Sequence, residues 1–247
     1  MKQFVLHAIC VLVAMTSCSK GKGGDGTNAA AEKGYATGKV VDTKGNPLAN
    51  VQVTIENVLP GASNSYLGKT DNKGLYKIKV GTVGAYRASA YHDVVYNGVA
   101  YSLPLHADND ETFSNDGAVR NFQWKLSGPM YSGGNYGSSV TLNSDINFYI
   151  DDPENVEYTL TPVGKLIDGS DGKVLTMRPG LPNTPSYEKL LDIPIGRYSL
   201  SAVYLNGGAR KPLRLKLTQD FEGAYKGSLV INFPAFFYEG VAVLYNE

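Results

Sequence analysis

The sequence predicts an all-β protein built as two β-sandwich domains in tandem. Short segments with alternating apolar and polar residues recur along the chain, which is the period of a half-buried strand. Asp-Gly, Lys-Gly and Asn-Gly turns separate these segments, and no long segment has the apolar period of an amphipathic helix. Strands of this kind give each sheet one apolar face, so two sheets must cover each other.

The first 17 residues have the pattern of a secretory signal peptide. Lys2 precedes an apolar run that ends at Met15 and is too short to span a bilayer. The small residues that follow it, and then Cys18, resemble the lipobox of bacterial lipoproteins. This resemblance implies cleavage before Cys18 and acylation of its thiol. The alternative is an ordinary signal peptide cut near Ser17, which would leave Cys18 as a free thiol.

Residues 18–34 are predicted to be a flexible tether, because they are Gly, Ala and polar residues without an apolar period. The whole layout resembles envelope lipoproteins of the Bacteroidota type. We therefore expect a protein of the cell envelope, lipid-anchored in the outer membrane, with the membrane as one partner. Whether it faces the periplasm or the cell surface stays open.

The charge of the chain argues against nucleic acid as a partner. The sequence holds 23 basic and 23 acidic residues, giving a formal net charge of zero, and no basic stripe stands out in it. We expect a glycan or an envelope protein as the partner instead.

The sequence contains little that indicates catalysis. It has no G-x-S-x-G elbow, no H-E-x-x-H pair and no phosphate-binding glycine loop. His92 and His106 are the histidines outside the leader. The acidic pairs at 151–152 and 168–171 lie in turn-like sequence. We expect no cofactor, no metal and no enzymatic activity, although a hydrolase with two carboxylates distant in sequence stays open.

Residues 35–128 are predicted to form the first sandwich. Four segments alternate, and in each the apolar side chains point to one face. The predicted inner residues are Val51, Val53, Ile55, Tyr76, Ile78, Val80, Tyr86, Ala88, Ala90, Phe122, Trp124 and Leu126. The phase of Trp124 favours packing in the core, and an exposed tryptophan that stacks on a sugar is the alternative.

Two stretches of this domain, "GKVVDTKGNPLANVQVTI" and "TDNKGLYKIKVGTVGAYRASA", resemble the carboxypeptidase regulatory-like domain. The resemblance covers residues 36–90 and implies a transthyretin-like sandwich without a catalytic zinc site. Gly45 and Gly74 suit turn positions with positive φ. Asp42 and Asp71 suit turns in which the side chain accepts hydrogen bonds from nearby amides.

Residues 91–120 depart from this pattern and are predicted to be a long connection. The segment carries His92, His106 and a string of acidic residues from 108 to 116. Calcium binding is one interpretation of the string, but it lacks the D-x-D-x-D-G order. The other interpretation is a solvated loop with Asx turns.

Residues 129–138 are predicted to be a Gly/Ser linker, which carries Tyr131 and Tyr136. Residues 139–247 are predicted to form a second sandwich, immunoglobulin- or transthyretin-like. Its predicted strands lie near 146–150, 156–160, 198–204, 213–217, 229–233 and 241–245, and "LIDGSDGKVL" is predicted to form a hairpin.

Three consecutive aromatic residues, Phe236, Phe237 and Tyr238, follow Pro234. They cannot all point inward from a strand, so at least one is exposed or packs under a loop. Together with Tyr131 and Tyr136, these residues are the predicted ligand contacts. The sequence favours a binding protein, whose partner is either a glycan or another protein of a nutrient-uptake complex. An assembly subunit joined by strand pairing is the alternative, and a hydrolase is a third.

Overall fold

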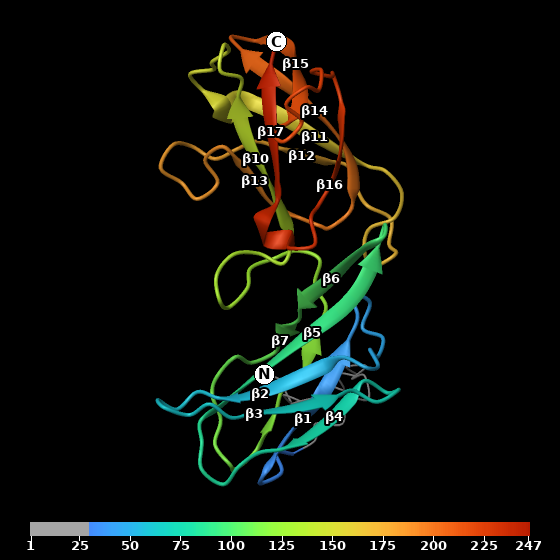
Figure 1. Cartoon of the computed structure of the whole chain (residues 1–247), viewed down its shortest axis with the longest axis vertical. Coiled ribbons are helices and arrows are strands. Elements are labelled where there is room, and N and C mark those ends of the chain that lie inside the picture. Colours follow the sequence, from blue (N-terminus) through green and yellow to red (C-terminus); the bar gives the residue numbers. More distant parts are fainter. Residues whose placement is uncertain (1–29) are drawn as a thin grey trace, which may run out of the picture.

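The computed structural model describes residues 30–247, apart from the side chain of Phe237. The predicted signal peptide and Cys18 lie outside the described residues. The fold is all-β, as predicted: the helical elements of the described part are the three-residue turns η1 (Pro153–Asn155) and η2 (Phe237–Glu239). Figure 1 shows two β-sandwich modules, the blue and green one below and the yellow to red one above. In this part of the chain no helix is long and apolar enough to cross a membrane.

The first module consists of two sheets. One has the order β4-β1-β9-β7, with β8 also paired to β1, and the other has the order β3-β2-β5-β6. The strands are β1 (Tyr35–Val41), β2 (Gln52–Asn57), β3 (Ser65–Lys69), β4 (Leu75–Lys79), β5 (Tyr86–Tyr96), β6 (Val99–Pro104), β7 (His106–Ala107), β8 (Ala118–Val119) and β9 (Phe122–Gln123).

The predicted inner residues of this module are confirmed as its core. Val53, Ile55 and Tyr86 are fully buried, and the other predicted inner residues are buried as well except Leu126, which is half-buried. Trp124 is 6% exposed, so it packs in the core and cannot stack on a sugar. The strand expected around it is shorter than predicted, because β9 ends at Gln123.

The two turns that carry the family resemblance form as predicted. Gly45 and Gly74 have φ values of 87° and 72°, which a residue without a side chain adopts at little cost. Asp42 Oδ1 accepts hydrogen bonds from the amides of Lys44 and Asn46. Asp71 plays the same part in the turn between β3 and β4.

The long connection predicted at 91–120 is wrong in its first half. Strand β5 continues to Tyr96, turns at Asn97 and Gly98, and returns as β6. Both turn residues have positive φ, 50° and 80°, which is the geometry of a two-residue hairpin. The sequence signal for this hairpin is Asn-Gly between two alternating segments.

The second module contains eight paired strands. The order is β12-β11-β14-β15-β17-β10-β13, with β16 also paired to β14. Strand β15 pairs with β14 through its first half and with β17 through its second half, so it passes from one sheet of the sandwich to the other. The strands are β10 (Ser138–Ser144), β11 (Val156–Pro162), β12 (Leu175–Met177), β13 (Lys189–Ile193), β14 (Arg197–Asn206), β15 (Ala209–Leu217), β16 (Leu229–Asn232) and β17 (Val241–Asn246).

One predicted strand of this module is wrong. Residues 146–150 are not a strand, and Ile146 is 97% exposed. Asp145 starts a turn there, because its side chain accepts a hydrogen bond from the amide of Asn147. The strand lies just before this turn as β10, and its inner residues are Val140 and Leu142. The hairpin predicted at 166–175 is instead a turn, which a single bridge between Lys165 and Asp171 closes.

The end of the predicted tether is also corrected. From Glu32 onward the chain already packs on the first module. The Lys77 ammonium lies 2.7 Å from Glu32, and the Gly34 amide donates a 2.7 Å hydrogen bond to the carbonyl of Asn115. The tether therefore ends before the predicted boundary at residue 34.

Candidate functional site

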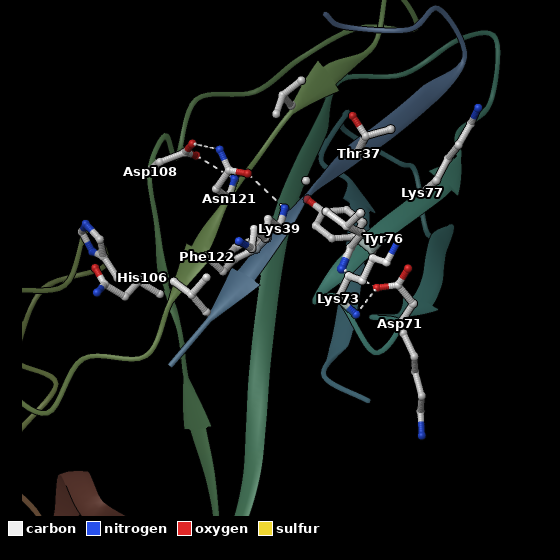
Figure 2. A pocket seen from close by; sticks show the side chains of 16 residues that line it. Thr37, Lys39, Asp71, Lys73, Tyr76, Lys77, His106, Asp108, Asn121 and Phe122 are labelled. Atoms are coloured by element: carbon white, nitrogen blue, oxygen red, sulfur yellow. Dashed lines mark hydrogen bonds between the residues drawn. The ribbon is translucent and has the colours of Figure 1, made fainter. Parts of the chain in front are cut away.

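A groove of about 950 Å³ crosses the outer face of the sheet that contains β1 and β4. Alternate residues of these strands face it, among them Thr37, Lys39, Leu75 and Lys77, because their neighbours in sequence point into the core. Figure 2 shows these side chains, with Asp108 and Asn121 entering from the other side of β1. The volume is at the upper end of the range for ligand pockets, about 300–1,000 Å³.

The floor of the groove is shaped by an interruption in the pairing along β1, at Arg120 and Asn121 between β8 and β9, which we call the step. Strand β1 runs parallel to both, and the chain between them, at Arg120 and Asn121, departs from the ladder. The Arg120 carbonyl lies over Gly38, where a Cβ atom would be 1.8 Å from the oxygen. The Tyr76 hydroxyl donates a 2.7 Å hydrogen bond to this carbonyl. Only glycine leaves room for the step.

Asn121 takes the place of a strand partner at this step. Its Oδ1 accepts a 3.0 Å hydrogen bond from the backbone amide of Lys39. Its own amide and its Nδ2 donate to the two carboxylate oxygens of Asp108, at 3.0 and 2.7 Å. The Asp108 carboxylate is therefore engaged in holding Asn121.

Four lysines line the groove: Lys39, Lys69, Lys73 and Lys77. Lys77 pairs with Glu32 and also lies 4.2 Å from the centroid of the Tyr35 ring. Among residues 30–247, the other three have no carboxylate within ion-pair distance. The acidic residues of the lining are Asp71 and Asp108, so the groove carries a net positive charge.

Aromatic rings gather at one end of the groove, around His106. The Tyr131 ring stacks on the imidazole with a centroid distance of 5.2 Å and an interplanar angle of 11°. Tyr131 itself remains 58% exposed. The Tyr136 hydroxyl lies 3.1 Å from Nδ1 of His106. Partial burial, and then the charge of Lys125, lower the pKa of His106, which favours the neutral form of the ring.

The loop that carries Tyr131 is closed at its base by Asp192. The Asp192 carboxylate accepts hydrogen bonds from the amides of Gly128 and Gly137, at 2.8 to 3.1 Å. The Tyr136 amide also donates to the carbonyl of Gly128. Because Asp192 belongs to β13, these bonds tie the predicted linker to the second module.

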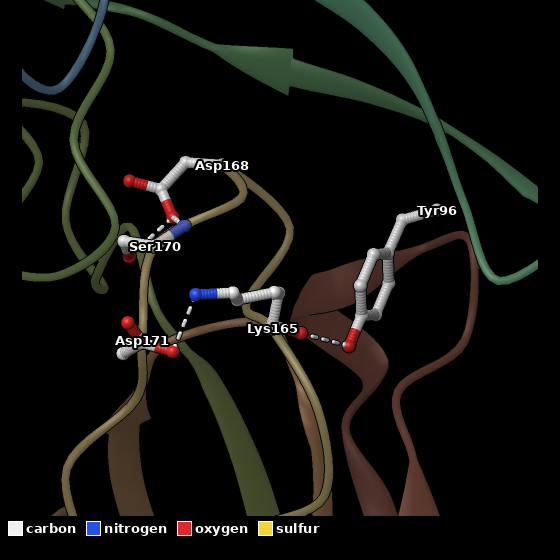
Figure 3. A network of polar contacts seen from close by, with 5 residues as sticks. All are labelled: Tyr96, Lys165, Asp168, Ser170 and Asp171. Carbon is white, nitrogen blue, oxygen red and sulfur yellow. Dashed lines mark hydrogen bonds and ion pairs between the residues drawn. The ribbon is translucent and has the colours of Figure 1, made fainter.

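The two modules are docked through hydrogen bonds and apolar packing. The Tyr96 hydroxyl donates a 2.7 Å hydrogen bond to the carbonyl of Lys165 (Figure 3). The oxygen of the Tyr96 hydroxyl also accepts a hydrogen bond from the amide of Arg197. The Tyr101 hydroxyl donates to the carbonyl of Phe233, also at 2.7 Å. A cavity of only about 10 Å³ remains between them, lined by Leu103, Pro104, Trp124, Lys125, Leu126, Tyr136, Ile167 and Ile195. Tyr136, at the base of the loop that carries Tyr131, therefore lies between the two modules.

The residues predicted as ligand contacts lie in different parts of the structure. Tyr131 is exposed beside His106 of the groove lining, whereas Tyr136 is 7% exposed and packs at the junction between the modules. Phe236 and Tyr238 are exposed next to each other in the second module, with ring centroids 6.0 Å apart. They do not line the large groove. The side chain of Phe237 and the whole of Cys18 lie outside the described residues.

The groove lysines are not among the residues that the sequence predicts as ligand contacts. Their positions are the outward positions of predicted strands and turns, where lysine is ordinary, and the balanced total charge hid their clustering. The pairing of β1 with β4 places Lys39 next to Leu75 and brings it near Lys77, which no local pattern reveals.

No protein-family model matches the chain, and no curated protein matches it. Among solved structures, it is similar to the Bacillus anthracis TIE protein, with 17% identity and a TM-score of 0.28 over 86% of this chain. It is also similar to a streptococcal ancillary pilin, with 13% identity and a TM-score of 0.27 over 84% of the chain. The chain spans 33% of the length of the first protein and 61% of the second.

Proposed function

We propose that this chain is a non-catalytic binding protein of the cell envelope, anchored through Cys18, that holds an extended glycan in the groove of its first module. One observation carries the proposal: a large open groove reaches His106, and the exposed ring of Tyr131 stacks on this residue. The anchor rests on the lipobox-like sequence before Cys18.

The chemistry of the groove supports a sugar polymer as the ligand. Pyranose rings present C–H faces that pack on aromatic rings and hydroxyl groups that need donors and acceptors. Tyr131 supplies such a ring, and its stacking on His106 limits its conformational freedom before binding. The lysines and Gln123 of the lining supply polar groups along the sheet. An open groove, rather than a closed cavity, lets a polymer extend beyond both ends.

The state of the acidic and imidazole groups favours binding over catalysis. The carboxylates of Asp71 and Asp108 are occupied as hydrogen-bond acceptors for turn amides and for Asn121. His106 is stacked against one tyrosine and within hydrogen-bond distance of another. Each of these groups thus has a structural partner that accounts for its position.

Affinity electrophoresis of the full chain in mild detergent tests the proposal, with gels that contain one polysaccharide each. We expect retardation in at least one gel, and Tyr131→Ala to weaken the binding about two- to tenfold, which is the contribution of one aromatic contact. Tyr149→Ala is the matched control, because Tyr149 is 75% exposed in the second module.

Equal losses in the two variants would contradict a site at Tyr131. If no polysaccharide retards the chain and it forms concentration-dependent oligomers instead, the glycan proposal fails and assembly by strand pairing takes its place.

A further inference from the structure

We infer that the groove selects an acidic polysaccharide, one whose sugar rings carry carboxylate or sulfate groups. The inference rests on the proposed function and adds the chemical class of its ligand. It is carried by the state of the charged side chains in the groove. Three of the four lysines form no ion pair within the described residues, whereas both carboxylates accept hydrogen bonds from groups of the protein.

The basic groups come from three separate parts of the first module. Lys39 lies on β1, Lys69 ends β3, and Lys73 lies in the turn before β4. Within the described chain, none of them has an acidic partner within 4 Å. Because they are distributed over different elements, they suit a ligand with repeated negative charges better than a single anion.

The two acidic groups of the lining lower the positive charge of the groove without neutralising it, and in the described chain neither forms an ion pair with these lysines. Asp71 accepts hydrogen bonds of 2.8 and 2.9 Å from two amides of its own turn. Asp108 accepts both of its hydrogen bonds from Asn121, which in turn holds the amide of Lys39. A neutral glycan offers the three ammonium groups hydroxyl oxygens alone, whereas an acidic glycan also offers them opposite charge.

Tyr131 favours an acidic sugar polymer over a polyanion without rings. A chain with charge but without rings would contact the lysines and leave the tyrosine face bare. The geometry therefore requires charge along the sheet and a stacking ring at the His106 end of the groove.

The test compares polygalacturonate with the same polymer after full methyl esterification, which removes the charge and keeps the rings. Affinity electrophoresis of the full chain is expected to show binding to polygalacturonate and at least about threefold weaker binding to the ester. Dextran sulfate beside dextran tests the sulfate source in the same way. Polyglutamate, an acidic polymer without sugar rings, is expected to bind more weakly than the better of the two acidic polysaccharides.

The double variant Lys39→Gln with Lys73→Gln is expected to weaken binding of the acidic polysaccharide about three- to tenfold. Added salt is expected to reduce the difference in affinity between the parent protein and this variant. Both side chains are exposed, and the backbone bonds of both residues remain. The control is Lys173→Gln with Lys211→Gln, two exposed lysines of the second module that change the net charge equally.

The inference would be overturned if the charged and the esterified polymer bound equally well and the substitution of Lys39 and Lys73 did not change the affinity. The proposed function would then still stand. Polyglutamate that binds as tightly as the acidic polysaccharides would also overturn the inference. Absence of binding to every polysaccharide would instead remove the proposed function itself.

Discussion

Asp192 fixes the loop that presents Tyr131. It has a φ of 62°, a left-handed conformation that aspartate and asparagine adopt more readily than most residues. In this conformation its carboxylate meets the amides of Gly128 and Gly137. The amide of Gly137 approaches closely because Gly137 has no side chain; a Cβ atom there would lie 2.5 Å from the Asp192 carbonyl carbon.

Asp192→Ala is predicted to lower the free energy of unfolding by about 1–3 kcal/mol, because two backbone amides lose their acceptor and alanine tolerates positive φ poorly. Asp192→Asn is the control and loses less, since it keeps one acceptor oxygen and the backbone preference. Urea unfolding followed by the fluorescence of Trp124, the sole tryptophan, measures both. An alanine variant as stable as the parent would show that the loop does not depend on this residue.

Strand β1 determines the shape of the groove at the scale of elements. It pairs with β4 on one side and with β8 and β9 on the other, and Gly38 lies where the step between β8 and β9 crosses it. The lining of the groove therefore depends on one glycine that faces a carbonyl group.

Gly38→Ala is predicted to destabilise the protein by about 1–3 kcal/mol, because its Cβ would meet the Arg120 carbonyl at 1.8 Å and the step would have to shift. The same shift is expected to weaken glycan binding. Gly227→Ala is the control: nothing lies within 4 Å of its added Cβ, so its effect is expected to stay within about 0.5 kcal/mol. Equal unfolding midpoints for the two variants would contradict the role given to the step.

Most individual strands were predictable because alternation is a local signal. Strands β2, β4, β14 and β17 follow from the burial of every second residue, and the turns at Asp42 and Asp71 follow from their residues. Residues 146–150 alternate as well, yet the side chain of Asp145 turns the chain there. Alternation over so few residues cannot outweigh a turn residue in front of it.

The groove was not predictable, because it depends on strand order. Lys39 and Lys73 are 34 positions apart in the printed sequence, and Asn121 is still further along. They line one surface only because β1 lies between β4 and β9. Tyr131 could be named from its place in a Gly/Ser linker, whereas the stacking of its ring on His106 could not.

The two modules behave as one body at the scale of the whole molecule. Their buried apolar side chains form one continuous cluster, and the residues around Trp124 and Ile195 bridge them. Three hydrogen bonds of tyrosine hydroxyls cross the same junction: Tyr96 donates one and accepts one, and Tyr101 donates one. The linker loop is packed between these contacts, so Tyr131 has a defined place relative to the lysines of the first module.

Hydrogen–deuterium exchange of the full chain, with and without the polysaccharide that retards it, tests the central claim most directly. The predicted result is slower exchange at residues 37–41, 71–77, 119–123 and 130–132, which surround the groove and its aromatic end, and unchanged exchange at residues 229–241 of the second module. Slower exchange at 229–241, with none in the first module, would place the ligand at the exposed rings of Phe236 and Tyr238 and contradict the account.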